Sequence, residues 1–133
     1  MARQQVGENM MQLQKSELAD AEWIDLQVLG ELKHEIGADV LKEVIEVYLT
    51  ELGEHVEQMQ QARHQNDWVA LGKLAHCIKS SSGSLGALRL YQAALSVETL
   101  CRKGAGEQCV PDYDNFLDFA GPTRDALLAY LEN

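Results

Sequence analysis

The chain has 133 residues, enough for one domain with a real core and too few for two ordinary ones. Apolar residues make up 46% of it and aromatic residues only 6%, with two prolines, which favours packed aliphatic helices over a sandwich or barrel. The formal net charge of −10 argues against nucleic acid as a partner, because phosphate binding needs a basic field.

The sequence carries no signal for a membrane span, for secretion or for paired cysteines. No stretch approaches the roughly 18 uninterrupted apolar residues of a membrane span, and the first residues lack the apolar core of a secretory signal, so we expect a soluble cytoplasmic protein. The three cysteines are odd in number and form no CxxC motif, which speaks against a disulfide framework or a zinc site. We expect reduced thiols.

The chain begins with a polar segment rich in Gln, Glu, Lys and Asn. We expect residues 1–20 to form a flexible tail and residues 21–133 to form the folded domain. The first helix is predicted from Asp25 to a C-cap at Gly37, because its apolar residues fall at helical spacing: Leu26, Leu29, Leu32 and Ile36.

A long amphipathic helix is predicted next. Its apolar residues keep one face from Leu41 to Met59, and it ends near Gln65. The third helix starts after the Asn66-Asp67 cap and runs to about Gly86.

The fourth helix is predicted from about Ala87 to Gly104. The last begins at Pro111, a favoured first helical residue, and Gly121-Pro122 should kink or split it. No strand-like alternation is present. The sequence therefore predicts an all-α fold, an antiparallel four-helix bundle with a short extra N-terminal helix.

Charge is unevenly distributed along this acidic chain. Between Trp68 and Gly106 there is a single acid, Glu98, so the stretch has a net charge of +4 and the remainder −14; the bases of the stretch are Lys73, Lys79, Arg89, Arg102 and Lys103. A basic region in an acidic protein indicates an anionic ligand or an acidic partner at that place.

His76 lies in the middle of this basic region, on the third helix. At 100° per residue, small residues occupy its own face within about 40°, and Lys73 and Lys79 lie about 60° to either side; the small residues are Gly72, Ser80 and Gly83. This wheel predicts an exposed imidazole without bulky neighbours. Each of the two glycines costs a helix about 1 kcal/mol, which close approach of another macromolecule would explain.

An exposed imidazole is a competent nucleophile near neutral pH, and a lysine one turn away can pair with an anion attached to it. The plain alternative is a surface histidine beside solvated charges. Two other interpretations have weaker support from the sequence. Glu31-x-x-His34 resembles half of a di-iron motif without a second copy, and His76 and Cys77, adjacent on a helix, point about 100° apart, which disfavours a Cys-His nucleophile.

The segment AHCIKSSSGSLGA, residues 75–87, resembles the signature of histidine-containing phosphotransfer (HPt) domains, approximately AHxLKGxxGxxGA. The resemblance continues in Leu95, Glu98, Arg102 and Gly104 and covers about residues 24–104. One departure is Ser80, where the family usually has glycine. This chain is similar to the LuxU-like phosphorelay subgroup in two places, the Lys-Ser pair at residues 79–80 and the run at residues 35–40.

The resemblance implies a phosphorelay carrier rather than an enzyme with ATP-dependent kinase activity. His76 would accept a phosphoryl group through Nε2 from an aspartyl phosphate on the receiver domain of a hybrid sensor kinase and pass it to a response regulator. Lys79 would neutralise the phosphoryl oxygens, and the partner would dock over Gly72, Lys73, Ser80, Gly83 and Arg102. The chain would need no cofactor of its own, and Mg²⁺ would belong to the receiver.

The resemblance leaves several questions open. The chain is expected to act as a monomer, but its donor, acceptor and pathway cannot be read from these residues. A helical adaptor or inhibitor that docks on a receiver or kinase without being phosphorylated would present a similar surface. The presence of both His76 and Lys79 favours the carrier.

Overall fold

The computed structural model describes residues 23–132, and all regular structure within that range is helical. Within these residues, five α-helices and one 3-10 helix follow one another: α3 (Leu26–Ile36), α4 (Ala38–His64), α5 (Trp68–Ser84), α6 (Leu88–Arg102), η1 (Gly106–Cys109) and α7 (Val110–Glu132). None of the described helices is long and apolar enough to cross a membrane.

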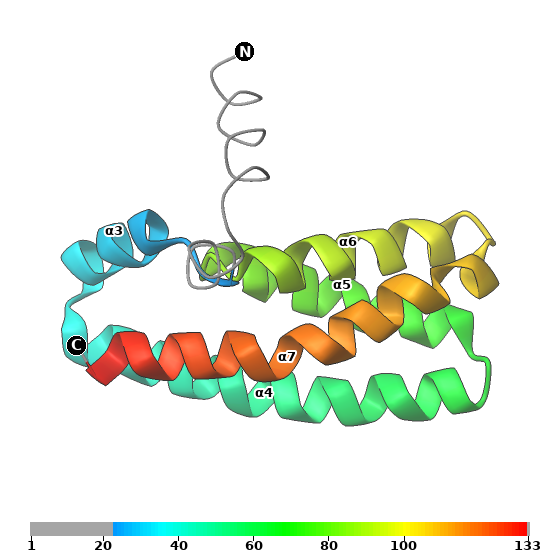
Figure 1. Ribbon diagram of the computed structural model, residues 1–133, viewed down its shortest axis with the longest axis horizontal. Helices are drawn as coiled ribbons and strands as arrows, with labels where there is room; N and C mark the ends of the chain where they lie inside the picture. The colour runs from blue at the N-terminus through cyan, green and yellow to red at the C-terminus, as the bar shows by residue number, and fades with distance from the viewer. Residues whose placement is uncertain (1–22, 133) are drawn as a thin grey trace, which may run out of the picture.

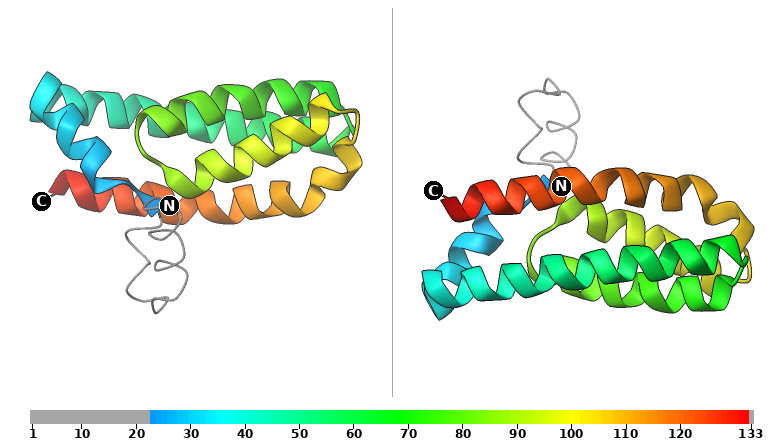
Figure 2. Two further views of the ribbon diagram at one scale, coloured as in Figure 1. Left: turned by 90° about the horizontal axis from the view of Figure 1, so that it is seen from above. Right: turned by 90° about the horizontal axis from the view of Figure 1, so that it is seen from below.

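The four long helices form the bundle, as expected from the sequence. They run side by side with short connections, and α3 crosses one end of the bundle (Figures 1 and 2). The most extensive packing is between α5 and α6, and α5 also contacts α4 on its other side. The prediction of a bundle with a short extra N-terminal helix is confirmed.

The helix boundaries follow from local capping chemistry. The Asp25 carboxylate accepts hydrogen bonds from the backbone N–H groups of Gln27 and Val28, which fixes the start of α3. The Asp67 carboxylate accepts from the N–H of Ala70 at the start of α5. Gly37, with φ of 87°, adopts the backbone conformation that separates α3 from α4.

The C-terminal part of the chain differs from the sequence prediction. The 3-10 helix η1 precedes α7, which begins at Val110, one residue before the predicted start. Pro122 lies inside α7, which continues through it, so the predicted split at this residue is wrong. A bend is visible between the orange and red parts of α7 in Figure 1. The predicted flexible tail at residues 1–20 lies outside the described residues.

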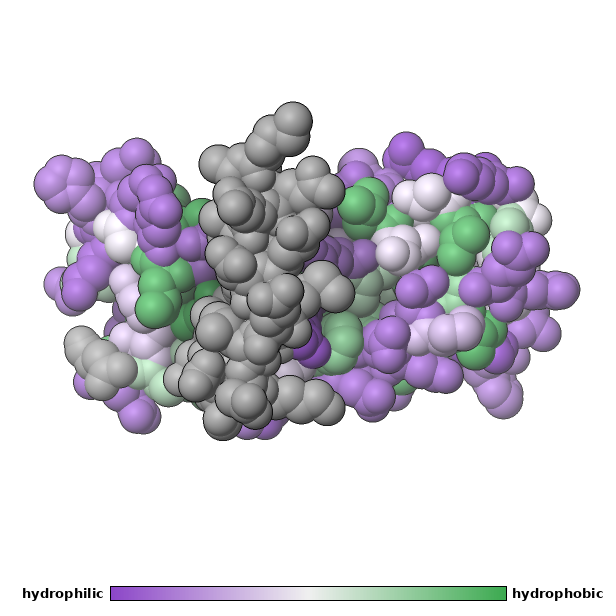
Figure 3. All heavy atoms as spheres, turned by 45° about the horizontal axis from the view of Figure 1, so that its top comes forward, coloured by the Kyte–Doolittle hydropathy of each residue, from purple (hydrophilic) through white to green (hydrophobic). Residues whose placement is uncertain are grey.

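The core is aliphatic with a few aromatic side chains. Its fully buried members come from the four helices of the bundle and from α3, and include Leu29, Ile45, Met59, Leu71, Ile78, Leu90, Phe116 and Leu127. On the face shown in Figure 3, hydrophilic residues dominate the visible described surface and hydrophobic ones form scattered patches.

A buried hydrogen bond fixes α5 against α4. The Tyr48 and Ser82 hydroxyl oxygens are 2.7 Å apart in the core, where either can donate. Burial raises the pKa of Tyr48 to about 12, against the opposing effect of the Ser82 hydrogen bond, so the phenol stays protonated. With α4 on one side and α6 on the other, the helix that carries His76 is held from both flanks.

Candidate functional site

The centre of the site is a hydrogen bond between α5 and α6. His76 extends from α5 with half of its side chain exposed, and its Nδ1 lies 2.5 Å from Oε2 of Glu98 on α6. A carboxylate only accepts, so Nδ1 carries the proton. In a neutral imidazole the lone pair is then on Nε2. The Glu98 bond thus presents the nucleophilic nitrogen on the other side of the ring.

Glu98 is almost entirely buried and has three cationic or potentially cationic partners. Lys79 Nζ donates to Oε1 at 2.7 Å, and Arg102 Nη2 lies 3.1 Å from Oε2, the oxygen that also binds His76. We call these four residues the Glu98 cluster. Burial acts to raise the pKa of Glu98, but the hydrogen bonds from Lys79 and His76 and the charge of Arg102 outweigh it, so the pKa is lowered.

The ionised carboxylate leaves the Glu98 cluster with a net charge of +1 when the imidazole is neutral. Much of that charge lies near solvent, since the Arg102 side chain is 68% exposed. An anion brought to Nε2 of His76 would therefore meet a positive local potential, although the whole chain is acidic.

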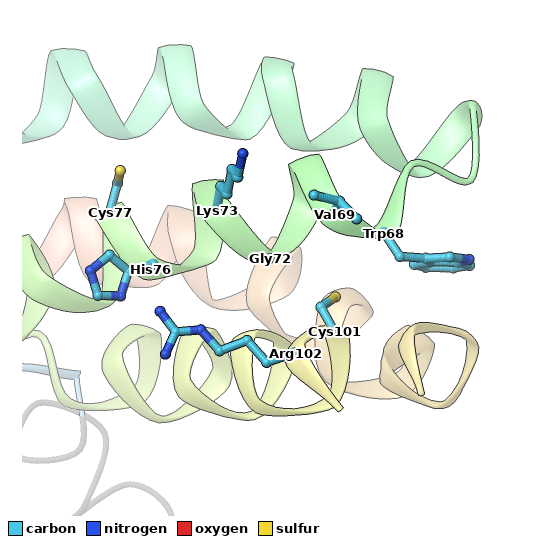
Figure 4. A pocket seen from close by; sticks show the side chains of 8 residues that line it. All are labelled: Trp68, Val69, Gly72, Lys73, His76, Cys77, Cys101 and Arg102. Atoms are coloured by element: carbon cyan, nitrogen blue, oxygen red, sulfur yellow. The ribbon is translucent and has the colours of Figure 1, made fainter. Parts of the chain in front are cut away.

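A cavity of about 510 Å³ opens beside His76, between α5 and α6. Trp68, Val69, Gly72 and Cys101 give it apolar walls, while Lys73 and Arg102 bring positive charge to it. Figure 4 shows the Arg102 guanidinium extending from α6 toward His76. In the same view Cys77 points away from His76, so the two do not form a Cys-His pair.

The two glycines near His76 have structural roles that the helical wheel did not predict. Gly72 is buried rather than exposed, because α6 packs against it: a Cβ there would lie 2.8 Å from Cys101 Cβ. Gly83 is exposed, but a Cβ there would lie 3.1 Å from Cδ1 of Tyr91. Helix packing therefore accounts for glycine at 72, and the expectation that this position is open to solvent is wrong.

Gly72→Ala is expected to destabilise the fold by about 1–3 kcal/mol, because the added methyl group overpacks the α5–α6 contact. Gly53→Ala is the matched control, since nothing lies within 4 Å of its added Cβ; it should stabilise α4 by about 0.5–1 kcal/mol. Urea unfolding of both variants measures the difference. Equal stability of the two would contradict the close packing of α5 on α6.

The structure brings together some of the predicted site residues and separates others. His76, Lys79 and Arg102 meet at Glu98. Lys73 is exposed and lines the cavity, whereas Ser80 is exposed and does not contribute to the cavity's lining. Among residues 23–132, no three or more His, Cys, Asp or Glu side chains are arranged to hold a metal ion.

Glu98 belongs to the arrangement around His76, but the sequence analysis did not include it among the site residues. It is 22 residues from His76 and on another helix, so no spacing rule connects them. Two signals were present: Glu98 is the single acid between Trp68 and Gly106, and it is among the residues that carry the resemblance to HPt domains. A single acidic side chain among five basic ones can be buried when basic side chains pair with its charge.

The lowered pKa of Glu98 predicts how stability depends on pH. A carboxyl whose folded pKa lies below its unfolded value stabilises the fold above the unfolded pKa, and that contribution is lost as pH falls through the folded pKa. Wild type should therefore lose stability on acidification below about pH 5, and Glu98→Gln should lose less over the same range. Urea unfolding at a series of pH values tests this. Parallel curves would show that Glu98 is not held ionised.

In this helical bundle a buried carboxylate orients an exposed imidazole, an arrangement that suits a protein that carries a chemical group on a histidine ring. The family model for the Hpt domain matches residues 43–133, well over half of the chain, and the chain belongs to this family. It is accordingly a phosphorelay protein of the phosphocarrier class.

Relatives and a solved structure agree with the family. The phosphorelay protein LuxU of Vibrio vulnificus is 28% identical over 112 residues, covering 84% of this chain and 97% of that one. LuxU of Vibrio harveyi is 24% identical, covering 77% and 90%. The crystal structure of histidine-containing phosphotransfer protein B from Pseudomonas aeruginosa PAO1 superimposes with a TM-score of 0.79 at 20% identity, covering 84% of this chain and 96% of that one. That likeness supports the fold.

Proposed function

We propose that His76 is the phosphoacceptor of this chain, and that it relays a phosphoryl group between two receiver domains. The observation that carries the proposal is the Nδ1–Glu98 hydrogen bond, which in a neutral imidazole places the lone pair on Nε2 of a ring that is half exposed. Membership of the Hpt family and similarity to the LuxU proteins support the reading.

The proposed transfer is a reversible exchange of one phosphoryl group. The Nε2 lone pair of His76 attacks the phosphorus of a receiver aspartyl phosphate, an N–P bond forms, and the O–P bond to the aspartyl carboxylate breaks. The Nδ1 proton remains on the ring and faces Glu98, which balances the positive charge that the imidazole gains. Transfer to the second receiver reverses these steps with its aspartate as the nucleophile.

Phosphoryl transfer also requires neutralisation of the phosphoryl charge and access of the receiver domain to His76. The cations of the Glu98 cluster, Lys79 and Arg102, supply positive charge close to the imidazole. The exposed positions Lys73, Ser80 and Gly83 form the surrounding surface on which a receiver would rest. Gly72 contributes indirectly, because its contact with Cys101 sets how closely α5 and α6 approach.

The partners follow from the same chemistry. The donor would be the receiver domain of a hybrid sensor kinase and the acceptor a response regulator. The Mg²⁺ that phosphoryl transfer from an aspartyl phosphate requires would be held by the receiver. The sequence has no Walker-type glycine loop, so the chain would act as a carrier without ATP-dependent kinase activity, as a cytoplasmic monomer.

The proposal is tested by mixing the chain with a receiver domain carrying a radiolabelled aspartyl phosphate and following the label on both proteins. Label should move to the chain in an acid-labile, base-stable bond, the stability expected of phosphohistidine. A second, unlabelled receiver should then remove it. Transfer that yields an acid-stable bond would exclude histidine as the acceptor.

The adaptor alternative predicts a different result in the same experiment. A docking protein would bind receivers over the basic surface around Lys73 and Arg102 and receive no label. Binding measured by calorimetry, together with unlabelled chain after incubation with every receiver of the organism, would replace the carrier proposal with the adaptor.

A further inference from the structure

Two cations contact Glu98, and they differ in how they are held. Lys79 Nζ binds Oε1 at 2.7 Å, with only 22% of its side chain exposed. Arg102 Nη2 is 3.1 Å from Oε2, with 68% of its side chain exposed. Lys79 is thus the more tightly bound and more buried of the two.

The two cations also bind different oxygens of the carboxylate. Arg102 shares Oε2 with Nδ1 of His76. The separation between Nη2 and Nδ1 therefore cannot exceed the sum of their distances to that oxygen. Lys79 is on the opposite oxygen. The guanidinium and the imidazole, moreover, line the same cavity, and Figure 4 shows the first extending toward the second.

The chemistry of the two side chains reinforces this difference. A guanidinium has several N–H donors in a planar fork, so Arg102 can keep one of them on Glu98 and offer others to an oxyanion nearby. Moving Lys79 toward the phosphoryl group would instead break its shorter contact with the nearly buried Glu98 carboxylate. Oε1 would then lose the Lys79 hydrogen bond, which would destabilise the fold.

We infer that Arg102 is the residue that contacts the phosphoryl group on His76, and that Lys79 is a positioning residue that holds Glu98 in place. The lysine one turn after the histidine then acts on the phosphoryl group only through the carboxylate. This inference rests on the proposed function, because it presupposes a phosphoryl group on Nε2.

The test compares three single-charge removals: Arg102→Gln, Lys79→Gln and Lys103→Gln. The last is a matched control, an exposed cation next to Arg102 that is not in the Glu98 cluster. Each protein is phosphorylated by a labelled receiver domain, and the ionisation of its phosphoryl group is followed by phosphorus NMR. A cation in contact with the group favours its dianion and so lowers the second pKa of the phosphoryl group.

Arg102→Gln should raise the second pKa of the phosphoryl group by roughly half a unit, the effect of one nearby but exposed charge. Lys79→Gln should raise it less, and Lys103→Gln least. Arg102→Gln should also slow transfer to the second receiver about tenfold, and Arg102→Lys should recover part of that rate. A larger phosphoryl pKa shift in Lys79→Gln than in Arg102→Gln would overturn the inference.

A second readout separates the two roles in the unphosphorylated protein. Lys79→Ala should lower the urea midpoint more than Arg102→Ala, because it removes the closer partner of a nearly buried carboxylate. The reverse order would also overturn the inference. Absence of label on His76 in wild type would instead overturn the proposed function, so the two failures are distinguishable.

Discussion

His76→Gln is expected to abolish acceptance of a phosphoryl group while leaving the bundle folded. Three other histidines, His34, His55 and His64, remain in this variant, and two of them, His34 and His64, are exposed, as His76 is. Exposure alone therefore does not select the acceptor. What sets His76 apart is the hydrogen bond from Nδ1 to Glu98, which directs the lone pair of a neutral ring to Nε2, and the positive charge beside it.

The expected loss is complete at the sensitivity of a gel-based label assay, because glutamine has no nucleophilic nitrogen. Folding should change little, since half of the imidazole is exposed, and glutamine retains a hydrogen-bond donor toward Glu98. His64→Gln is the matched control and should accept label at the wild-type rate. Label persisting on a folded His76→Gln protein would show that the acceptor is elsewhere in the chain.

Much of the fold could be predicted because helix boundaries in this chain are local. Asp25 and Asp67 are N-caps whose side chains bind the first N–H groups of their helices, and Gly37, with its positive φ of 87°, separates α3 from α4. These interactions depend on residues within three positions of one another. Of the two outcomes predicted at Gly121-Pro122, a kink or a split, the split did not occur, because packing of α7 on the bundle can retain a helix that proline locally weakens.

The site was predicted only as far as one helix allows. Periodicity placed His76 on the outer face of α5 correctly, but it placed Gly72 there as well, because a wheel does not show which sector a neighbouring helix covers. The α6 helix covers the sector that contains Gly72 and Lys79, which explains the close contact with Cys101 and the low exposure of the lysine. Glu98 enters the site by the same tertiary packing.

Glu98 connects the stability of the fold to the chemistry of the site. Its carboxylate is almost buried and is compensated by Lys79, Arg102 and the Nδ1 proton of His76. A buried carboxylate with such partners is costly to disrupt. The same contact selects the tautomer of the imidazole, so a substitution at Glu98 changes reactivity even where the protein remains folded.

Glu98→Ala is expected to reduce the rate of phosphoryl acceptance by about 10- to 100-fold, the usual cost of removing the carboxylate that orients a functional imidazole. Stability should also fall, by about 1–3 kcal/mol, because the partly buried Lys79 loses its acceptor. Without Glu98, both tautomers of His76 become available and the ring is free to rotate. Nitrogen NMR of the imidazole should therefore show a mixture of Nδ1–H and Nε2–H forms in place of a single Nδ1–H form.

Glu98→Gln separates orientation from packing, because glutamine has nearly the same shape. Its amide has one oxygen and one NH₂ group. Lys79 can only donate and is the more buried of the two cations, so the oxygen should turn toward Lys79 and the NH₂ group toward Nδ1, while the exposed guanidinium of Arg102 moves into solvent. Nδ1 must then accept, which places the proton on Nε2 and removes the nucleophile from the exposed side of the ring. This variant should consequently be more stable than Glu98→Ala but no faster in accepting phosphate. Wild-type transfer by a folded Glu98→Gln protein would show that the tautomer of His76 does not depend on Glu98.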